Sequence, residues 1–176
     1  MASVENVYMM DVPDHWETGT VSIDEISLQY YSCGDGLPIV LAHGFFANGR
    51  CWERLVEDLS ANYRVIAYDA RAHGKSDAPE EGYDIDTRVR DLEKVIDDLG
   101  LSKPVLFGHS MGASTVAVTA AKKPSLTRGL ILSDPAGMHG DPDIKPEERK
   151  KMVSEDLEEA KSSDLTEVAK EYSNLN

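Results

Sequence analysis

The stretch Val105-Leu-Phe-Gly-His-Ser-Met-Gly112 decides the fold of this chain. A short β-branched and aromatic run enters a Gly-x-Ser-x-Gly turn, and the small-residue run Ala113–Ala121 leaves it, so the order predicts strand, sharp turn and helix. Such a turn lifts the Ser110 hydroxyl clear of both elements, where a base can reach it. Gly108 and Gly112 remove side chains that would otherwise hold the helix away from the strand. Ser110 is therefore the candidate nucleophile; the alternative is a glycine-rich loop without chemistry.

A second site lies upstream, where Pro38-Ile-Val-Leu-Ala predicts a buried strand that ends at His43-Gly44-Phe45-Phe46. Acyl transfer places negative charge on a carbonyl oxygen, and backbone N–H donors aimed at that oxygen stabilise it by several kcal/mol. We expect one donor to be the amide of Met111 and the other to be the amide of Phe45. The two stretches together predict an oxyanion hole beside Ser110.

These motifs, with Asp69-Ala-Arg-Ala-His-Gly-Lys-Ser76, have an order and spacing that resemble the α/β-hydrolase superfamily over about residues 23–137. The resemblance implies a hydrolase that acts on small carboxylic esters, lactones or related acyl compounds through a serine acyl-enzyme, without a cofactor. Serine at the turn argues against the dehalogenase and epoxide-hydrolase branches, which use aspartate there. A cofactor-free perhydrolase, a non-catalytic ligand-binding protein and a truncated product without function remain alternatives.

Strands and helices alternate from Pro38 onwards, which predicts an α/β fold with a doubly wound, mostly parallel sheet flanked by helices. The carboxyl ends of the strands then form the site. The expected elements are a hairpin over 18–32, a strand from 38, a helix over 50–59, a strand over 63–68, a helix within 82–99, the strand from 105, the helix behind Ser110 and a sixth strand over 129–133. The helix within 82–99 is interpreted as scaffold, with Asp86 or Thr87 as its cap and Gly100 ending it.

The loop after the 63–68 strand carries Ala72 where relatives commonly have glycine. If that turn needs a positive φ, alanine costs about 1 kcal/mol there. Asp69, Arg71 and His73 are interpreted as polar groups that brace the turn. A catalytic role for His73 is the alternative.

Three segments follow from the change in character along the chain: a lead-in over 1–17, a partial hydrolase core over 18–137, and residues 138–176 as the start of a helical lid or an acidic tail. Complete relatives usually carry eight strands, so we expect this chain to stop after strand six. An unpaired sheet edge templates association. Self-association through that edge is therefore expected.

The remaining members of a serine triad are not apparent. In this fold the order is serine, acid, histidine, and only His139 follows Ser110 among the five histidines. His139 lies in a connector rather than after a last strand, which argues against it as the base. Asp134, just after the sixth strand, is the possible acid, with a turn cap before Pro135 as the alternative.

Acidic residues outnumber basic ones 32 to 18, giving a formal charge of -14. This charge disfavours nucleic acid, anionic membrane surfaces and acidic ligands as partners, and it fits either a high-salt adaptation or an acidic mesophilic protein. The sequence shows no signal peptide, no run of 18 apolar residues and no cluster of metal ligands. Cys33 and Cys51 are expected to be free thiols in a reducing cytoplasm.

Overall fold

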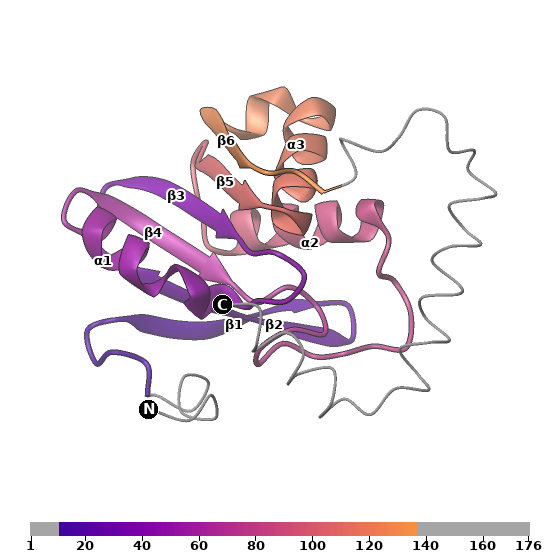
Figure 1. The fold of residues 1–176 in the computed structure, drawn as a ribbon, viewed down its shortest axis with the longest axis horizontal. Coiled ribbons are helices and arrows are strands. Elements are labelled where there is room, and N and C mark those ends of the chain that lie inside the picture. The colour runs from indigo at the N-terminus through magenta and orange to yellow at the C-terminus, as the bar shows by residue number, and fades with distance from the viewer. Residues whose placement is uncertain (1–10, 137–176) are drawn as a thin grey trace, which may run out of the picture. The chain divides into compact units, whose positions relative to one another are not determined.

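Six strands form one sheet in the order β1-β2-β4-β3-β5-β6. The computed structural model describes residues 11–136, which fall within a compact unit spanning residues 1–138. The strands are β1 Glu17–Ile23, β2 Ile26–Cys33, β3 Leu37–Ala42, β4 Tyr63–Tyr68, β5 Val105–His109 and β6 Gly129–Ser133. β1 and β2 pair as an antiparallel hairpin, β2 is antiparallel to β4, and β3, β4, β5 and β6 run parallel (Figure 1). The predicted doubly wound, mostly parallel sheet is confirmed.

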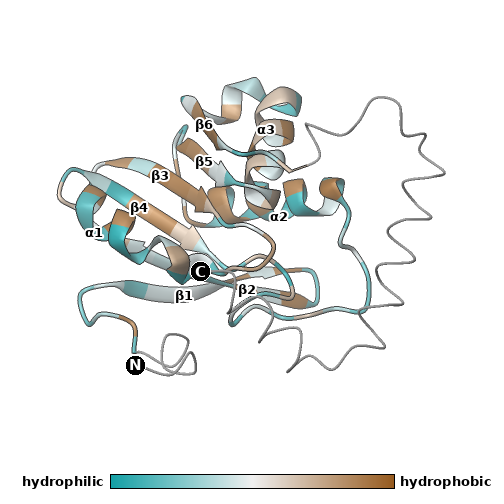
Figure 2. Ribbon diagram, viewed as in Figure 1, coloured by the Kyte–Doolittle hydropathy of each residue, from teal (hydrophilic) through white to brown (hydrophobic). Residues whose placement is uncertain are grey.

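Each strand of the sheet's centre buries both of its faces, because side chains alternate along it. In β3, Val40 and Ala42 join one core cluster, while Ile39 and Leu41 join the other. Hydrophobic residues therefore follow one another along β3 and β4 (Figure 2). A sheet buried on both faces needs a helical layer on each side, and the chain provides both.

Helices α2 (Ile85–Asp98) and α3 (Met111–Lys122) cover the first face, and helix α1 (Glu53–Ser60), preceded by the short helix η2 (Gly49–Trp52), covers the second. A short helix η3 (Pro124–Leu126) follows α3. Trp16 is buried beside Tyr31 on the α1 face, and its indole N–H donates to Glu57 at 2.7 Å. The end of the predicted lead-in therefore packs against the core.

The strand order places a topological switch point beside β3. The chain leaves β3 for α1 and β4 on one side, whereas β5 pairs on the other side and continues into α3 on the opposite face. Loops that diverge in this way leave a crevice at the carboxyl ends of the two strands. The loop from His43 and the turn at Ser110 both lie at this position.

One sequence interpretation of α2 is wrong. Asp84 caps the helix, with its carboxylate accepting from the Thr87 amide at 2.9 Å, so neither Asp86 nor Thr87 is the cap. Within α2, Asp91 is 3% exposed and accepts two 2.6 Å hydrogen bonds from Arg71. Gly100 has φ 62 and ends the helix as predicted.

The loop after β4 has the bracing role that its polar residues predicted. The Asp69 carboxylate accepts from the amides of Gly49 at 2.6 Å and Lys75 at 2.8 Å, so it ties this loop to η2. Ala72 has φ 59, which is the left-handed conformation that favours glycine. The turn therefore carries the backbone strain that alanine at this position predicted.

β6 lies at the edge of the sheet among the described strands, and Leu130, Ile131 and Leu132 are 39%, 48% and 39% exposed. Three consecutive exposed aliphatic side chains on an edge strand are unusual for a solvated surface. Residues 138–176, the predicted lid or acidic tail, lie outside the described residues. Within the described part of the chain, no helix is long and apolar enough to cross a membrane.

Candidate active site

Ser110 sits in a strained turn between β5 and α3, with φ 50 and ψ -114. A non-glycine residue rarely adopts this conformation, and it costs of order 1–3 kcal/mol. The two flanking glycines are sterically required. A Cβ on Gly108 would lie 2.4 Å from the Gly112 carbonyl carbon, and one on Gly112 would lie 2.1 Å from the Ala42 carbonyl oxygen. The strand-turn-helix geometry predicted from the sequence is therefore present.

The loop after β3 touches this turn. A Cβ on Gly44 would lie 2.9 Å from His109 Nδ1 and 3.4 Å from Ser110 Cβ, so glycine at position 44 allows the two loops to approach. A surface hollow of about 520 Å³ opens beside them, within the size range of small-molecule sites. It is lined by Phe45, Ile85, Arg88, Ser110, Met111, Ser114, Val118 and Ala136. The nucleophile and both expected oxyanion donors thus border one hollow.

The amides of Phe45 and Met111 have the freedom that an oxyanion hole requires. Met111 is the first residue of α3, so its N–H has no acceptor within the helix. The Phe45 amide donates to no acceptor in the described part of the chain. The Phe45 carbonyl instead accepts from His73 Nε2 at 2.7 Å, which fixes the orientation of that loop. This contact gives His73 a bracing role.

His43 is a buried structural histidine. Its Nε2 accepts from the Ala70 amide at 2.9 Å, so its Nδ1 carries the proton and donates to the Gly44 carbonyl at 2.7 Å. Burial lowers the pKa of His43 and keeps the ring neutral. Both nitrogens are engaged, which leaves none to accept a proton from Ser110.

Two other described histidines are also placed elsewhere, while His109 precedes Ser110 at the end of β5 and its ring lies against Gly44. His73 contacts the carbonyl oxygens of Arg71 and Phe45 through its two nitrogens, and His15 pairs with Glu57. Within residues 11–136, no histidine is hydrogen-bonded to Ser110 Oγ. His139, the candidate weighed from the sequence, lies outside the described residues.

Asp134 follows β6, and backbone hydrogen bonds hold its loop close to the turn at Ser110. The Ser110 amide donates to the Ser133 carbonyl at 2.9 Å, and the Ala136 amide donates to the Ser110 carbonyl at 3.1 Å. Asp134 itself is exposed, with φ 45. The structure therefore brings its loop to the nucleophile, and its role as the acid stays a prediction.

Arg88 was missed from the sequence. It borders the hollow beside Ser110 although α2 was interpreted as scaffold. The available signal was its spacing, since positions 88, 92 and 95 share one helical face and Leu92 and Val95 are fully buried. A cation on that face is not a solvated residue.

The cysteines and possible metal ligands are the remaining reactive groups. Cys33 and Cys51 are free thiols, as expected. Among the described residues, no group of three or more histidine, cysteine, aspartate or glutamate side chains is arranged to hold a metal ion.

Comparison with known proteins gives consistent matches. A family model described as the alpha/beta hydrolase fold matches residues 38–165. A putative non-heme chloroperoxidase of Synechocystis is 48% identical over 92 residues, covering 52% of this chain and 33% of that protein. A 2-(acetamidomethylene)succinate hydrolase of Mesorhizobium japonicum is 36% identical over 121 residues, covering 69% of this chain and 44% of that protein.

Solved structures agree on the fold. The epoxide hydrolase VrEH1 of Vigna radiata superposes with a TM-score of 0.71 at 26% identity, covering 79% of this chain and 46% of that one. The chain thus spans between a third and a half of the length of these relatives.

Proposed function

This chain belongs to the alpha/beta hydrolase fold family, and on that premise we propose that it carries the nucleophile of a hydrolase acting on small carboxylic esters or related acyl compounds. Ser110 attacks the acyl carbon, and the amides of Phe45 and Met111 bind the oxygen that becomes negative. The observation that carries the proposal is the strained backbone of Ser110 at the rim of the 520 Å³ hollow. A strained residue of this kind is retained where it serves a function.

Serine also selects among the chemistries of the relatives. Attack of a serine oxygen on an epoxide carbon gives an ether, which has no carbonyl for water to attack, so the enzyme would not be regenerated. Attack on an ester gives an acyl-enzyme, which water hydrolyses. The epoxide hydrolases found among the solved structures therefore support the fold, and Ser110 favours acyl substrates.

The hydroxyl of Ser110 needs a base, and we place that base outside residues 11–136. His43 and His73 have both ring nitrogens engaged, and His109, whose Nδ1 lies against Gly44, forms no hydrogen bond to Ser110. Loss of one triad member typically costs several orders of magnitude in rate. The 176-residue chain is therefore expected to hydrolyse p-nitrophenyl acetate slowly.

Labelling with a fluorophosphonate tests the proposal without requiring turnover, and for the same reason we expect the labelling to be slow. We expect the label on the peptide that contains Ser110, its loss in Ser110→Ala, and its retention in the control Ser125→Ala, which changes an exposed serine in η3. Labelling that survives Ser110→Ala would refute the assignment. Binding of an ester analogue without labelling would favour the non-catalytic ligand-binding alternative.

A second candidate function follows from the chloroperoxidase relative. If hydrogen peroxide replaces water, its oxygen attacks the acyl-enzyme carbonyl, the serine leaves with a proton, and a peracid forms. We expect peracid formation from acetate and peroxide to require Ser110. Halogenation of a dye that needs peroxide but not the carboxylic acid would exclude this route.

A further inference from the structure

The guanidinium of Arg88 is a cation without a described partner. Its Nε is buried and has no hydrogen-bond acceptor, and Arg88 forms no ion pair within residues 11–136. Burial lowers its pKa, which shows that its environment disfavours the charge. An unpaired charge taken from water costs several kcal/mol. The position of the Arg88 charge is therefore not explained by a contribution to the stability of the fold.

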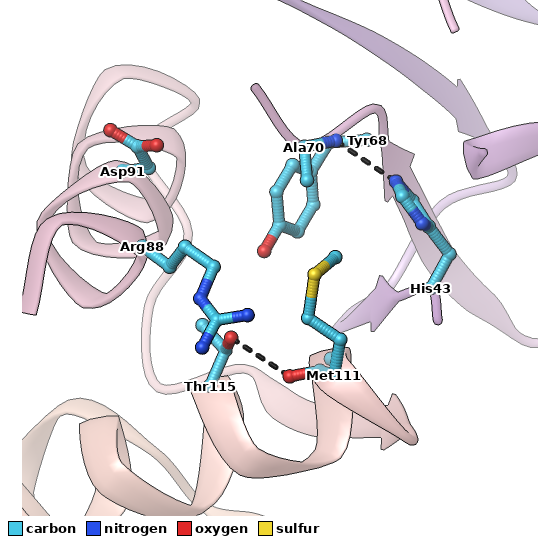
Figure 3. A pocket seen from close by; sticks show the side chains of 8 residues that line it. His43, Tyr68, Ala70, Arg88, Asp91, Met111 and Thr115 are labelled. Carbon is cyan, nitrogen blue, oxygen red and sulfur yellow. Dashed lines mark hydrogen bonds between the residues drawn. The ribbon is translucent and has the colours of Figure 1, made fainter. Parts of the chain in front are cut away.

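The nearby carboxylates are already engaged. Asp91 is bound by both arms of Arg71 at 2.6 Å and points away from the Arg88 guanidinium (Figure 3). Asp84 accepts hydrogen bonds from the Thr87 amide and hydroxyl at the start of α2. Asp84 and the Tyr68 hydroxyl raise the pKa of Arg88, but burial outweighs both. The described chain therefore supplies a buried arginine, Arg71, and a half-buried one, Arg88, and the carboxylate of Asp91 is taken by Arg71.

Arg88 lies between two spaces of very different size. Behind it, a cavity of about 10 Å³ is lined by His43, Tyr68 and Thr115 among others, which is room for one water molecule at most. In front of it lies the 520 Å³ hollow that Ser110 and Met111 border. Figure 3 shows the guanidinium extending from α2 toward Met111 and Thr115. Only the hollow can take an anionic group of several atoms.

The hollow is otherwise suited to an acyl chain. Its other described lining residues are apolar apart from the hydroxyls of Ser110 and Ser114, and Arg88 is its one charged residue. A few polar groups in an apolar site fix the orientation of a ligand. The planar guanidinium matches a carboxylate with two parallel hydrogen bonds.

From this arrangement we propose that Arg88 binds a carboxylate on the acyl part of the substrate, so the preferred substrates are half-esters of dicarboxylic acids. This proposal rests on the proposed function, because it assigns the acyl group to the hollow beside Ser110. Arg88 is a substrate-binding residue, and bound carboxylate supplies the acceptor that its guanidinium lacks. A neutral ester gains no such contact.

The test compares mono-p-nitrophenyl adipate with its methyl ester, a pair that differs only in the free carboxylate. We expect the chain to prefer the acid, and Arg88→Met to lower the ratio of kcat/KM for acid over methyl ester about ten- to a hundredfold. Arg88→Lys should retain part of the preference. Arg90→Met, which removes an exposed arginine from the same helix, is the matched control and should leave the ratio unchanged.

Binding of an unreactive probe separates this proposal from the proposed function. The mono-p-nitroanilide of adipic acid should bind to the 176-residue chain and shift the ¹⁵N–¹H signal of Arg88 Nε, and Arg88→Met should abolish binding. Binding with this dependence but without phosphonate labelling of Ser110 would retain the Arg88 assignment and remove the hydrolase. Labelling of Ser110 with equal affinity for the acid and methyl ester probes would do the reverse. Loss of both signals would overturn both.

Discussion

Replacing Ser110 with glycine is expected to stabilise the fold relative to replacing it with alanine. Both changes remove the hydroxyl, so the comparison isolates the backbone conformation of φ 50 and ψ -114. A non-glycine residue held there costs about 1–3 kcal/mol, and glycine costs about 0.5–1 kcal/mol more in chain entropy. Taking the middle of each range, the glycine variant should therefore exceed the alanine variant by about 1 kcal/mol in free energy of unfolding.

Urea denaturation measures this difference directly. With an m value of about 1–3 kcal/mol/M, the midpoint should be a few tenths of a molar to about 1 M higher for glycine, at unchanged m. The same pair of substitutions at Ser114, inside α3, is the matched control. There the sign reverses, because glycine in a helix is about 1 kcal/mol less stable than alanine. Equal midpoints for the two Ser110 variants would show that the backbone of the turn at Ser110 is not strained.

Three further outcomes test the structure. Ala72→Gly should raise the free energy of unfolding by about 0.5–1 kcal/mol, because φ 59 disfavours alanine; a lower melting temperature would contradict this. Burial lowers the pKa of His43 in the folded state, so the unfolded chain binds more protons than the folded chain below about pH 6.5. The free energy of unfolding should therefore fall as the pH decreases below that value. Urea unfolding at pH 7.5 and 5.5 measures this difference, and His43→Gln should make it smaller. Ile131, exposed on the edge of β6, is proposed to mediate self-association, so Ile131→Lys should reduce any dimer seen by sedimentation, and an unchanged dimer fraction would exclude this edge.

Local patterns predicted most of the described fold. Alternation of apolar and polar residues predicted the hairpin of β1 and β2, and the Gly-x-Ser-x-Gly turn predicted the junction of β5 and α3. These signals work because the backbone geometry at each position depends on residues within a few places in the chain. The positive φ of Ala72 was predictable for the same reason.

Charged residues on α2 were not predictable in this way. An acid in an amphipathic helix is usually solvated, yet Asp91 is buried as a bidentate pair with Arg71, twenty positions earlier. A contact between the loop after β4 and α2 depends on the packing of the whole layer, which no local window contains. Arg88 escaped notice because α2 was interpreted as scaffold.

Neither the sequence nor the described residues identify the acid and the base of a triad, for a related reason. Ser110 and the oxyanion amides come from loops adjacent in the sheet, so motif order alone brings them together. The base is expected from a more distant part of the polypeptide, because His43 and His73 have both ring nitrogens engaged. The position of His139 and the role of Asp134 therefore stay predictions.

Arg88 also changes what the overall charge of -14 implies for ligands. A net charge acts at long range and is screened within about 8 Å at physiological ionic strength, so it governs the rate at which an anion approaches. Binding inside an apolar hollow is governed by the nearest charge, whose interaction is strengthened where water is excluded. The acidic surface therefore disfavours encounter with acidic ligands without excluding them from the site. If Arg88 binds a carboxylate as proposed, a single cation beside Ser110 makes a small carboxylate the preferred occupant of the hollow in a chain whose net charge is -14.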